Sequence, residues 1–187
     1  MSIQERRERE RAEREKLIVT AAREIAESEG WEAVTTRRLA ERIEYSQPVL
    51  YSHFKGKDAI MAAVVVEGSA ELAAELRAGR QDADAALAGV GAAYSAFAER
   101  HPALYDAMFS QRVDLPFATP QAPEALHAAF GELVEAVRPH AGGEDLTLLA
   151  ETFWAALHGL VTLTRGDRLP PEHHERRLAL LLARFAG

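Results

Sequence analysis

Every strong apolar period in this chain is helical. Ile18, Ala21, Ala22, Ile25 and Ala26 recur at i, i+3, i+4, i+7 and i+8, which places them on one face of a helix. No segment alternates apolar and polar residues over the length of a strand between turn signals, and no internal repeat is visible. The pattern therefore predicts an all-α fold.

The composition limits the class of protein further. The chain has 187 residues, of which 48% are hydrophobic, enough for a sizeable buried core in one domain, or in a small domain joined to a larger one. It contains no cysteine, which excludes disulfides, thiolate metal sites and a cysteine nucleophile. The longest charge-free stretch, residues 85–98, spans 14 residues, fewer than the roughly 18 that cross a bilayer. Since the Arg- and Glu-rich N-terminus also lacks a secretory signal, we expect a soluble, cytoplasmic protein with no membrane partner.

The acidic total charge hides a difference between the two parts of the chain. The formal net charge is −7, which is unusual for a protein that binds nucleic acid. Residues 1–57 carry 12 Lys and Arg against 11 Asp and Glu, a net of +1, whereas residues 58–187 carry 10 against 18, a net of −8. A weakly positive N-terminal part thus precedes an acidic remainder, but this asymmetry does not identify a partner by itself, because a surface patch counts for more than a regional sum of charge.

Capping residues divide the chain into about nine helices. The first is predicted from near Glu10 to Glu29, with residues 1–8 frayed and Gly30 as a left-handed cap. Thr35 and Ser46 are the predicted N-caps of two short helices, and a fourth helix follows Gly56 from residue 57 to 77. The later helices are predicted at residues 82–100, 102–110, 123–140, 144–165 and 171–186.

Residues 35–54 have the pattern of a helix-turn-helix, in which two short helices are joined by three or four residues. Ala40 is small enough to let the second of these helices pack closely, and Leu39, Ile43, Leu50 and Phe54 supply a core. The helix after Ser46 presents polar and aromatic side chains near its N-terminus, where a recognition helix meets the major groove. A short helical hairpin that merely connects other elements has the same period and stays open as an alternative.

Lys57 helps to separate these alternatives. It lies in the first turn of a predicted helix, where the helix dipole disfavours a cation. A lysine in this place is explained if it faces a phosphate group. The other explanation is a solvated surface lysine, whose energetic effect is small.

Two segments resemble the N-terminal domain of the tetracycline-repressor (TetR) family of transcriptional regulators. They are Thr35-Thr36-Arg37-Arg38-Leu39-Ala40 and the stretch from Tyr45 to Asp58, whose most specific part is Leu50-Tyr51-x-His53-Phe54-x-x-Lys57-Asp58. The likeness covers residues 10–62. It implies a three-helix DNA-binding domain over residues 1–56, followed by a helical effector-binding and dimerisation domain over residues 57–187.

The resemblance also implies which residues contact DNA. They are Thr35, Thr36, Arg37, Ser46, Gln47, Pro48, Val49, Tyr51, Ser52, His53 and Lys57, with Tyr51 and Lys57 on backbone phosphates. Two positions depart from the family pattern. Glu44 occupies a turn position where the family often has Gly, so a left-handed backbone is expected there at some energetic cost. Gln47 stands where the family often has a basic residue, and it can read an adenine or reach only a phosphate.

The segment 153–160, Phe-Trp-Ala-Ala-Leu-His-Gly-Leu, resembles a C-terminal subtype of the family with a Trp and a His-Gly pair (WHG). Aromatic residues and small neighbours could line a largely apolar effector pocket, for which the candidates are Tyr94, Phe97, Tyr105, Phe109, Phe130, Trp154 and His158. Tight packing around Ala residues is an equally good explanation of the small side chains. Trp154 and His158, four residues apart on one helix, also fit an ordinary core stripe.

The last two predicted helices are more apolar than one helix of a monomer requires. The final helix is apolar over residues 178–183 and at Phe185, on nearly all sides. We therefore expect a homodimer through a four-helix interface, made by Phe153, Ala156, Leu160, Leu178, Leu181, Leu182 and Phe185. Dimerisation would separate two recognition helices by about one duplex turn, so a palindromic operator is expected.

An enzyme is not expected. A di-metal site in a helical bundle needs two Glu-x-x-His pairs, and the chain has one, Glu124 and His127. His173 and His174 are adjacent and point about 100° apart on a helix, so they do not easily share a metal. No phosphate-binding loop or nucleophile elbow occurs, and no metal or other cofactor is expected.

The sequence is therefore interpreted as a homodimeric transcriptional regulator that binds double-stranded DNA. By resemblance it is a repressor, released from a palindromic operator when a largely apolar small molecule shifts the helix after residue 57. The alternative is a DNA-binding regulator without a small-molecule effector, controlled by a protein partner or by dimerisation.

Overall fold

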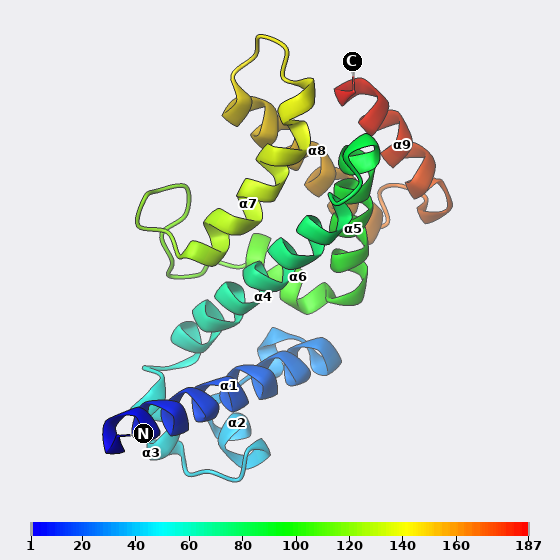
Figure 1. The fold of residues 1–187 in the computed structure, drawn as a ribbon. Helices are drawn as coiled ribbons and strands as arrows, with labels where there is room; N and C mark the ends of the chain where they lie inside the picture. Colours follow the sequence, from blue (N-terminus) through cyan, green and yellow to red (C-terminus); the bar gives the residue numbers. More distant parts are fainter. Residues whose placement is uncertain (1, 187) are drawn as a thin grey trace. The chain divides into compact units, whose positions relative to one another are not determined.

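The computed structural model describes residues 2–186, and all regular structure in that range is helical (Figure 1). This confirms the predicted all-α fold. The elements are α1 (Ile3–Glu29), η1 (Trp31–Ala33), α2 (Thr36–Arg42), α3 (Gln47–His53), α4 (Lys57–Gly79), η2 (Ala83–Ala85), α5 (Ala86–Arg100), α6 (Pro102–Phe109), α7 (Glu124–Val137), η3 (Arg138–His140), α8 (Leu146–Arg165), η4 (Pro171–His173) and α9 (His174–Phe185), where η marks a 3-10 helix.

These elements form two compact units. Unit 1 comprises residues 2–68 and 101–121, and unit 2 comprises residues 69–100 and 122–186. Helix α4 contributes residues to both units, and α6 belongs to unit 1 although it follows α5 in the chain. The functional division at residue 56, between a DNA-binding and an effector-binding domain, stays a prediction.

Helix α1 begins much earlier than the sequence analysis expected. The Ser2 hydroxyl accepts from the backbone N–H of Glu5 at 3.1 Å, and the Glu5 carboxylate accepts from the backbone N–H of Ser2 at 2.7 Å. This capping box satisfies two N–H groups at the helix start. The prediction that residues 1–8 fray is therefore wrong for residues 2–8, and Met1 lies outside the described residues.

The core of unit 1 lies between α1 and the short helices that follow it. The predicted apolar stripe of α1 is buried, and Leu39 of α2 and Leu50 of α3 are fully buried. Helix α6 is fixed to α1 by the Glu27 carboxylate, which accepts from the backbone N–H groups of residues 103 and 104 at 2.9 and 3.0 Å. The indole N–H of Trp31 donates to the carbonyl of Ala103 at 2.7 Å. These contacts hold the start of α6 against the end of α1.

The core of unit 2 is built from α5, α7, α8 and α9. Gly79 and Gly89 let α4 approach α5 so closely that a Cβ placed on Gly89 would lie 1.9 Å from the carbonyl oxygen of Gly79. The helix predicted over residues 123–140 is shorter in the structure because of a proline. Pro139 has no N–H for an α-helical bond, so α7 ends at Val137 and the chain continues as η3.

Helix α8 is the one helix among residues 2–186 that is long and apolar enough to cross a membrane by length and composition. This helix is not a single charge-free run in the sequence because Glu151 interrupts it. Phe153, Leu157 and Val161 of α8 are buried in the core of unit 2, yet only 22% of its most apolar stretch is buried. One side of α8 therefore packs in the core of unit 2, whereas most of its apolar stretch is not buried.

Candidate DNA-binding surface

The turn between α2 and α3 has the geometry that a helix-turn-helix requires. Thr35 caps α2, since its hydroxyl accepts from the backbone N–H of Arg38 at 3.2 Å, as predicted. Glu44 has a φ of 57°, which confirms the expected left-handed turn residue. The backbone N–H of Tyr45 then donates to the carbonyl of Ala40 at 3.0 Å. Ser46 is the N-cap residue of α3, but its side chain makes no capping hydrogen bond.

Helix α3 has one inward and one outward face. Leu50 is fully buried and anchors the helix in unit 1. The other face is exposed to solvent, with 52% of Tyr51 and 37% of Val49 accessible. The predicted contact residues on this face are Gln47, Pro48, Val49, Tyr51 and Ser52, all of them exposed. This short helix buries one leucine and exposes five side chains on its other face. The exposed face is therefore available for contact with another molecule, as a recognition helix requires.

The start of α2 adjoins this exposed face. The Thr36 hydroxyl lies 3.5 Å from the Tyr51 hydroxyl, so the beginning of α2 and the middle of α3 meet at the surface. Thr35 and Arg37 are exposed beside them. The guanidinium of Arg37 donates to the Glu41 carboxylate at 2.9 Å, and this hydrogen bond raises the pKa of Arg37 above its usual value. The structure thus brings together eight of the eleven predicted contact residues, Thr35 to Arg37 and the five on α3.

His53 lies elsewhere. Its ring Nδ1 is 3.4 Å from the Glu15 carboxylate of α1, and only 7% of its side chain is exposed. It therefore packs on the inner side of α3 and does not belong to the outward face, contrary to the expectation from the family pattern. Its position follows from the helical period, because His53 is three residues after the buried Leu50.

Lys57 is half-buried at the first turn of α4. Its ammonium group donates to the carbonyl oxygen of Trp31 at 2.5 Å. It is therefore not a freely solvated surface lysine, which was the other explanation of this residue. For the ammonium group to meet a phosphate, it must exchange this carbonyl or share its three N–H donors between the two oxygens.

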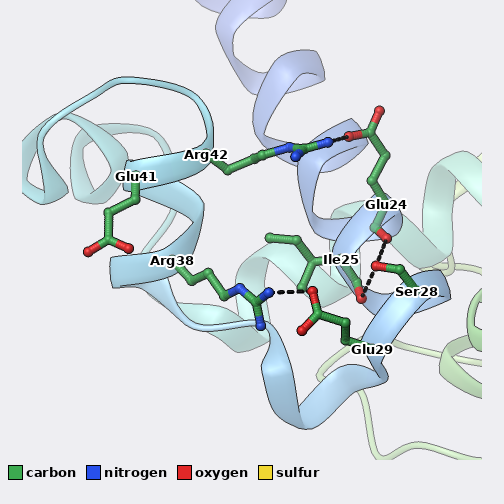
Figure 2. A pocket seen from close by; sticks show the side chains of 7 residues that line it. All are labelled: Glu24, Ile25, Ser28, Glu29, Arg38, Glu41 and Arg42. Atoms are coloured by element: carbon green, nitrogen blue, oxygen red, sulfur yellow. Dashed lines mark hydrogen bonds and ion pairs between the residues drawn. The ribbon is translucent and has the colours of Figure 1, made fainter.

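A polar pocket of about 330 Å³ lies between α1 and α2 (Figure 2). Arg42 donates to Glu24 at 2.9 Å, Arg38 pairs with Glu29, and the Ser28 hydroxyl donates to the carbonyl of Glu24 at 2.8 Å. The arginines and glutamates of the pocket neutralise one another across the two helices. The pocket therefore fixes α2 on α1, which sequence reasoning missed because the partners are 9 and 18 residues apart.

The predicted effector-pocket residues are divided between the two units. Tyr105 and Phe109 belong to unit 1, where their rings make an edge contact at 4.7 Å. In unit 2, the indole N–H of Trp154 donates to the Tyr94 hydroxyl at 3.0 Å, and the ring of Phe130 lies 6.4 Å from that of Trp154. Phe97 is fully buried.

His158 is the titratable member of the predicted pocket. Its Nε2 lies 3.3 Å from the Thr162 hydroxyl. Burial, with a smaller contribution from the positive charge of Arg165, lowers the pKa of His158 below its ordinary value. The lowered pKa favours the neutral form of the imidazole. Whether these side chains receive an effector stays a prediction.

Four of the seven predicted dimer-interface residues have packing partners in their own chain. Phe153 is fully buried and its ring lies 5.1 Å from that of Phe185. Leu178 and Leu182 pack toward Gly91 of α5. Ala156, Leu160 and Leu181 are half-exposed. Sequence reasoning missed the most exposed large apolar residues of α8 and α9, which are Leu148, Leu163 and Leu180, because a helical stripe does not show which of its sides is covered.

No group of three or more His, Asp or Glu side chains that could hold a metal ion occurs among the described residues.

The fold and the exposed face of α3 define a helix-turn-helix protein with a helical second unit. Residues 18–64 match the family model described as bacterial regulatory proteins of the tetR family, and residues 87–185 match the tetracyclin repressor-like C-terminal domain.

Individual relatives agree with these matches. An uncharacterised HTH-type transcriptional regulator of Mycobacterium tuberculosis (strain ATCC 25618 / H37Rv) is 31% identical over 150 residues, covering 78% of this chain and 67% of that protein. A solved protein of unknown function from Rhodococcus sp. RHA1 has a TM-score of 0.77 and 25% identity, covering 92% of this chain and 93% of that one. The SmeT–triclosan complex has a similar fold, with a TM-score of 0.57, 22% identity, and 91% and 88% of the two chains covered.

The chain belongs to the tetracycline-repressor family of DNA-binding transcriptional regulators. It is a regulator and not an enzyme. The likeness of residues 153–160 to the WHG subtype stays a prediction.

Proposed function

We propose that this protein is a cytoplasmic repressor that binds a palindromic operator as a homodimer and is released by a largely apolar small molecule. The observation that carries the DNA-binding part of this proposal is the exposed face of α3. Leu50 anchors this helix in the core, and on its outer face the Tyr51 hydroxyl lies 3.5 Å from the Thr36 hydroxyl of α2. Hydroxyl, amide and apolar side chains gathered on one short exposed helix are suited to the edges of bases and to phosphates.

Some of the proposed contacts position α3 on the DNA backbone, and others read the sequence of its bases. The Tyr51 hydroxyl and the Lys57 ammonium group are assigned to backbone phosphates, which fix the register of the helix on the duplex. For Lys57, a phosphate replaces or joins the neutral carbonyl of Trp31, and a hydrogen bond between two charged groups is the stronger of the two. Gln47 and Ser52 are assigned to base edges in the major groove.

The homodimer is proposed to form through the uncovered sides of α8 and α9. Leu148 and Leu163 of α8 and Leu180 of α9 are 61%, 44% and 59% exposed. A Cβ placed on Gly159 would meet no atom within 4 Å, so a small-residue position of α8 is open. Exposed leucines beside open small residues suit the close approach of a second helix.

The effector is proposed to bind in unit 2 near Tyr94, Phe130 and Trp154. The indole N–H of Trp154 donates to the Tyr94 hydroxyl, and the ring of Phe130 makes an edge contact with that of Trp154, so these three side chains already lie together. The lowered pKa of His158 favours its neutral form, which adds no charge beside them. The similar fold of the SmeT–triclosan complex supports a small molecule as the ligand. Because α4 contributes to both units, a ligand that prefers one position of α4 would change DNA binding by the roughly 1–3 kcal/mol typical of such couplings.

The complete burial of Tyr94 and Phe97 favours a second candidate function. If these side chains only fill the core, the regulator has no small-molecule effector and responds to a protein partner or to dimerisation. A thermal-shift screen with hydrophobic compounds separates the two, since a ligand that binds only the folded state raises the unfolding midpoint.

The DNA-binding proposal is tested by fluorescence anisotropy with the intergenic duplex upstream of the protein's own coding sequence. Wild-type affinity should fall steeply with salt, and Tyr51→Phe and Lys57→Ala should both weaken binding. Lys16→Ala, which removes one positive charge from an exposed position of α1, is the matched control for Lys57→Ala. Unchanged binding in both the Tyr51 and the Lys57 variants would refute the assignment of the site.

A further inference from the structure

The first half of α1 lies outside the family match, which begins at residue 18. We call residues 3–16 the N-terminal arm. It is fully helical, and its start is fixed by the capping box of Ser2 and Glu5. The arm carries six basic and five acidic side chains, so its total charge alone indicates no partner. The distribution of those charges around the helix, however, indicates one.

Three arginines form a stripe along one side of the arm. Arg7, Arg11 and Arg14 are spaced i, i+4 and i+7, and continuing the same spacing leads to Ile18 and Ile25, which are buried. The stripe therefore extends the core-facing side of α1 beyond the point where the core ends. The other basic residues lie off the stripe by the same helical period: Arg9 and Lys16 are on the opposite side, and Arg6 is about 100° from Arg7.

The glutamates cancel only part of this stripe, because three of the five are engaged away from it and one, Glu15, pairs with Arg11. Glu5 belongs to the capping box, Glu8 accepts from the Gln4 amide at 2.7 Å, and Glu10 pairs with Arg6 at 3.6 Å. Glu15 accepts from Arg11 at 2.8 Å. By contrast, the exposed side chains of Arg7 and Arg14 have no hydrogen-bond or ion-pair partner among residues 2–186.

The arm runs past the end of the recognition helix. The Glu15 carboxylate oxygen that accepts from Arg11 also lies 3.4 Å from Nδ1 of His53, the last residue of α3. Residues 3–14 continue beyond this contact for about 18 Å, at about 1.5 Å per residue.

The side of α1 that bears the stripe is also the side that faces α3. The inner face of α3 packs toward α1 through Leu50 and His53, and its outer face is the candidate DNA surface. By the helical period, the stripe therefore lies on the side of α1 that packs against α3, next to the helix that bears the candidate DNA surface.

We propose that the N-terminal arm is a second DNA-binding element, whose Arg7, Arg11 and Arg14 contact duplex phosphates next to the segment read by α3. The proposal rests on the proposed DNA-binding function and extends it to a part of the chain outside the family match. The ligand is the double-stranded backbone, because the stripe carries charge without the amide or apolar groups that read bases. At 3.4 Å per base pair, 18 Å corresponds to about five flanking base pairs on each side.

The test compares two matched triple variants of the full chain by fluorescence anisotropy over a range of salt concentrations. Arg7→Ala/Arg11→Ala/Arg14→Ala removes the stripe, and Arg6→Ala/Arg9→Ala/Lys16→Ala removes the same charge from outside the stripe. Alanine is a strong helix former, so circular dichroism should show an intact helix in both variants. The probes are the upstream intergenic duplex delimited by footprinting and the same duplex shortened by six base pairs at each end.

Loss of the stripe should weaken binding to the long duplex at least about tenfold at 0.15 M salt and lower the salt slope by about two to three per protomer. The off-stripe variant should keep the wild-type slope, and shortening the duplex should affect the wild type but not the stripe variant. Equal behaviour of the two triple variants, or no effect of shortening on the wild type, would overturn the arm while leaving the recognition helix in place. A wild-type chain that binds neither duplex would overturn both proposals.

Discussion

Glu132 offers a quantitative test of how unit 2 is held together. This residue of α7 has a side chain that is only 7% exposed, and it accepts three hydrogen bonds from two arginines of the α4 end. The Arg77 Nε donates at 2.7 Å, and the Arg80 Nε and Nη2 donate at 3.0 and 2.8 Å. The buried carboxylate is therefore compensated, among the described contacts, by Arg77 in the last turn of α4 and by Arg80 directly after that helix.

The effect of Glu132→Gln follows from these bonds. A hydrogen bond to a charged group contributes about 1.5–3 kcal/mol and a neutral one about 0.5–1.5. The amide keeps one acceptor but turns its NH2 group toward guanidinium donors, so at least one of the three bonds is lost outright. Since Arg77 and Arg80 remain 64% and 31% exposed, water offsets part of the loss. We expect Glu132→Gln to lower the free energy of unfolding by about 2–3 kcal/mol.

Removing Arg80 should lower the free energy of unfolding more than removing Arg77. Arg80 makes two of the three bonds and is the less exposed partner, so Arg80→Ala should cost about 1.5–3 kcal/mol. Arg77→Ala should cost less than about 1 kcal/mol, because most of that side chain is solvated. In a double-mutant cycle, Glu132→Gln and Arg80→Ala should be coupled by more than about 1 kcal/mol.

Urea unfolding at pH 7, followed by circular dichroism and tryptophan fluorescence, measures these differences. Trp154 lies in unit 2 and reports on the part of the chain that the substitutions change. A loss below about 0.5 kcal/mol for Glu132→Gln, or a larger loss for Arg77→Ala than for Arg80→Ala, would show that this ion cluster does not join α4 to α7.

Three further predictions concern packing, pH and association. Gly89→Ala should destabilise the chain by about 1–3 kcal/mol in the same urea assay, because the new Cβ would lie 1.9 Å from a backbone oxygen of Gly79; an unchanged midpoint would contradict the close approach. Because the pKa of His158 is lowered in the folded state, the unfolded chain binds the proton more readily, so stability should fall as pH is lowered through about 6.5, and His158→Gln should remove this part of the profile. Gly159→Arg should yield a folded monomer in analytical ultracentrifugation whereas Gly131→Arg on α7, where a Cβ is also free of contacts, should leave the association state unchanged; a dimeric Gly159→Arg variant would exclude this side of α8.

The sequence predicted features that depend on neighbouring residues. The cap at Thr35 and the left-handed Glu44 are both confirmed, because a capping hydrogen bond and a turn conformation involve only a few consecutive residues. Gly30 has the expected positive φ of 84°, but its ψ of 163° lies outside the left-handed helical region that was predicted for this cap. The early start of α1 was missed although Ser2 and Glu5 carry the capping-box pattern, since each stabilising contact in that segment is small and only their sum maintains the helix.

Features that depend on distant residues could not be predicted. Glu132 and Arg80 are 52 residues apart, and no local pattern indicates that a glutamate inside an apolar helix has two arginines to meet. The orientation of His53 toward Glu15, 38 residues earlier, likewise depends on how α1 crosses α3. The family pattern places His53 near DNA, whereas the tertiary contact decides which side of the helix it occupies. The DNA-binding face as a whole remains a prediction from the motif and its exposure.

Hydroxyl-radical footprinting of the full-length protein on its upstream intergenic duplex tests the central claim most directly, namely that the outer face of α3 lies in the groove of duplex DNA. We expect two protected segments related by two-fold symmetry, with centres about 10 base pairs or a multiple apart. Both should disappear in a Gln47→Ala/Ser52→Ala variant that retains the wild-type circular dichroism spectrum. Protection that persists unchanged in that variant, or an unprotected duplex at low salt, would contradict the claim.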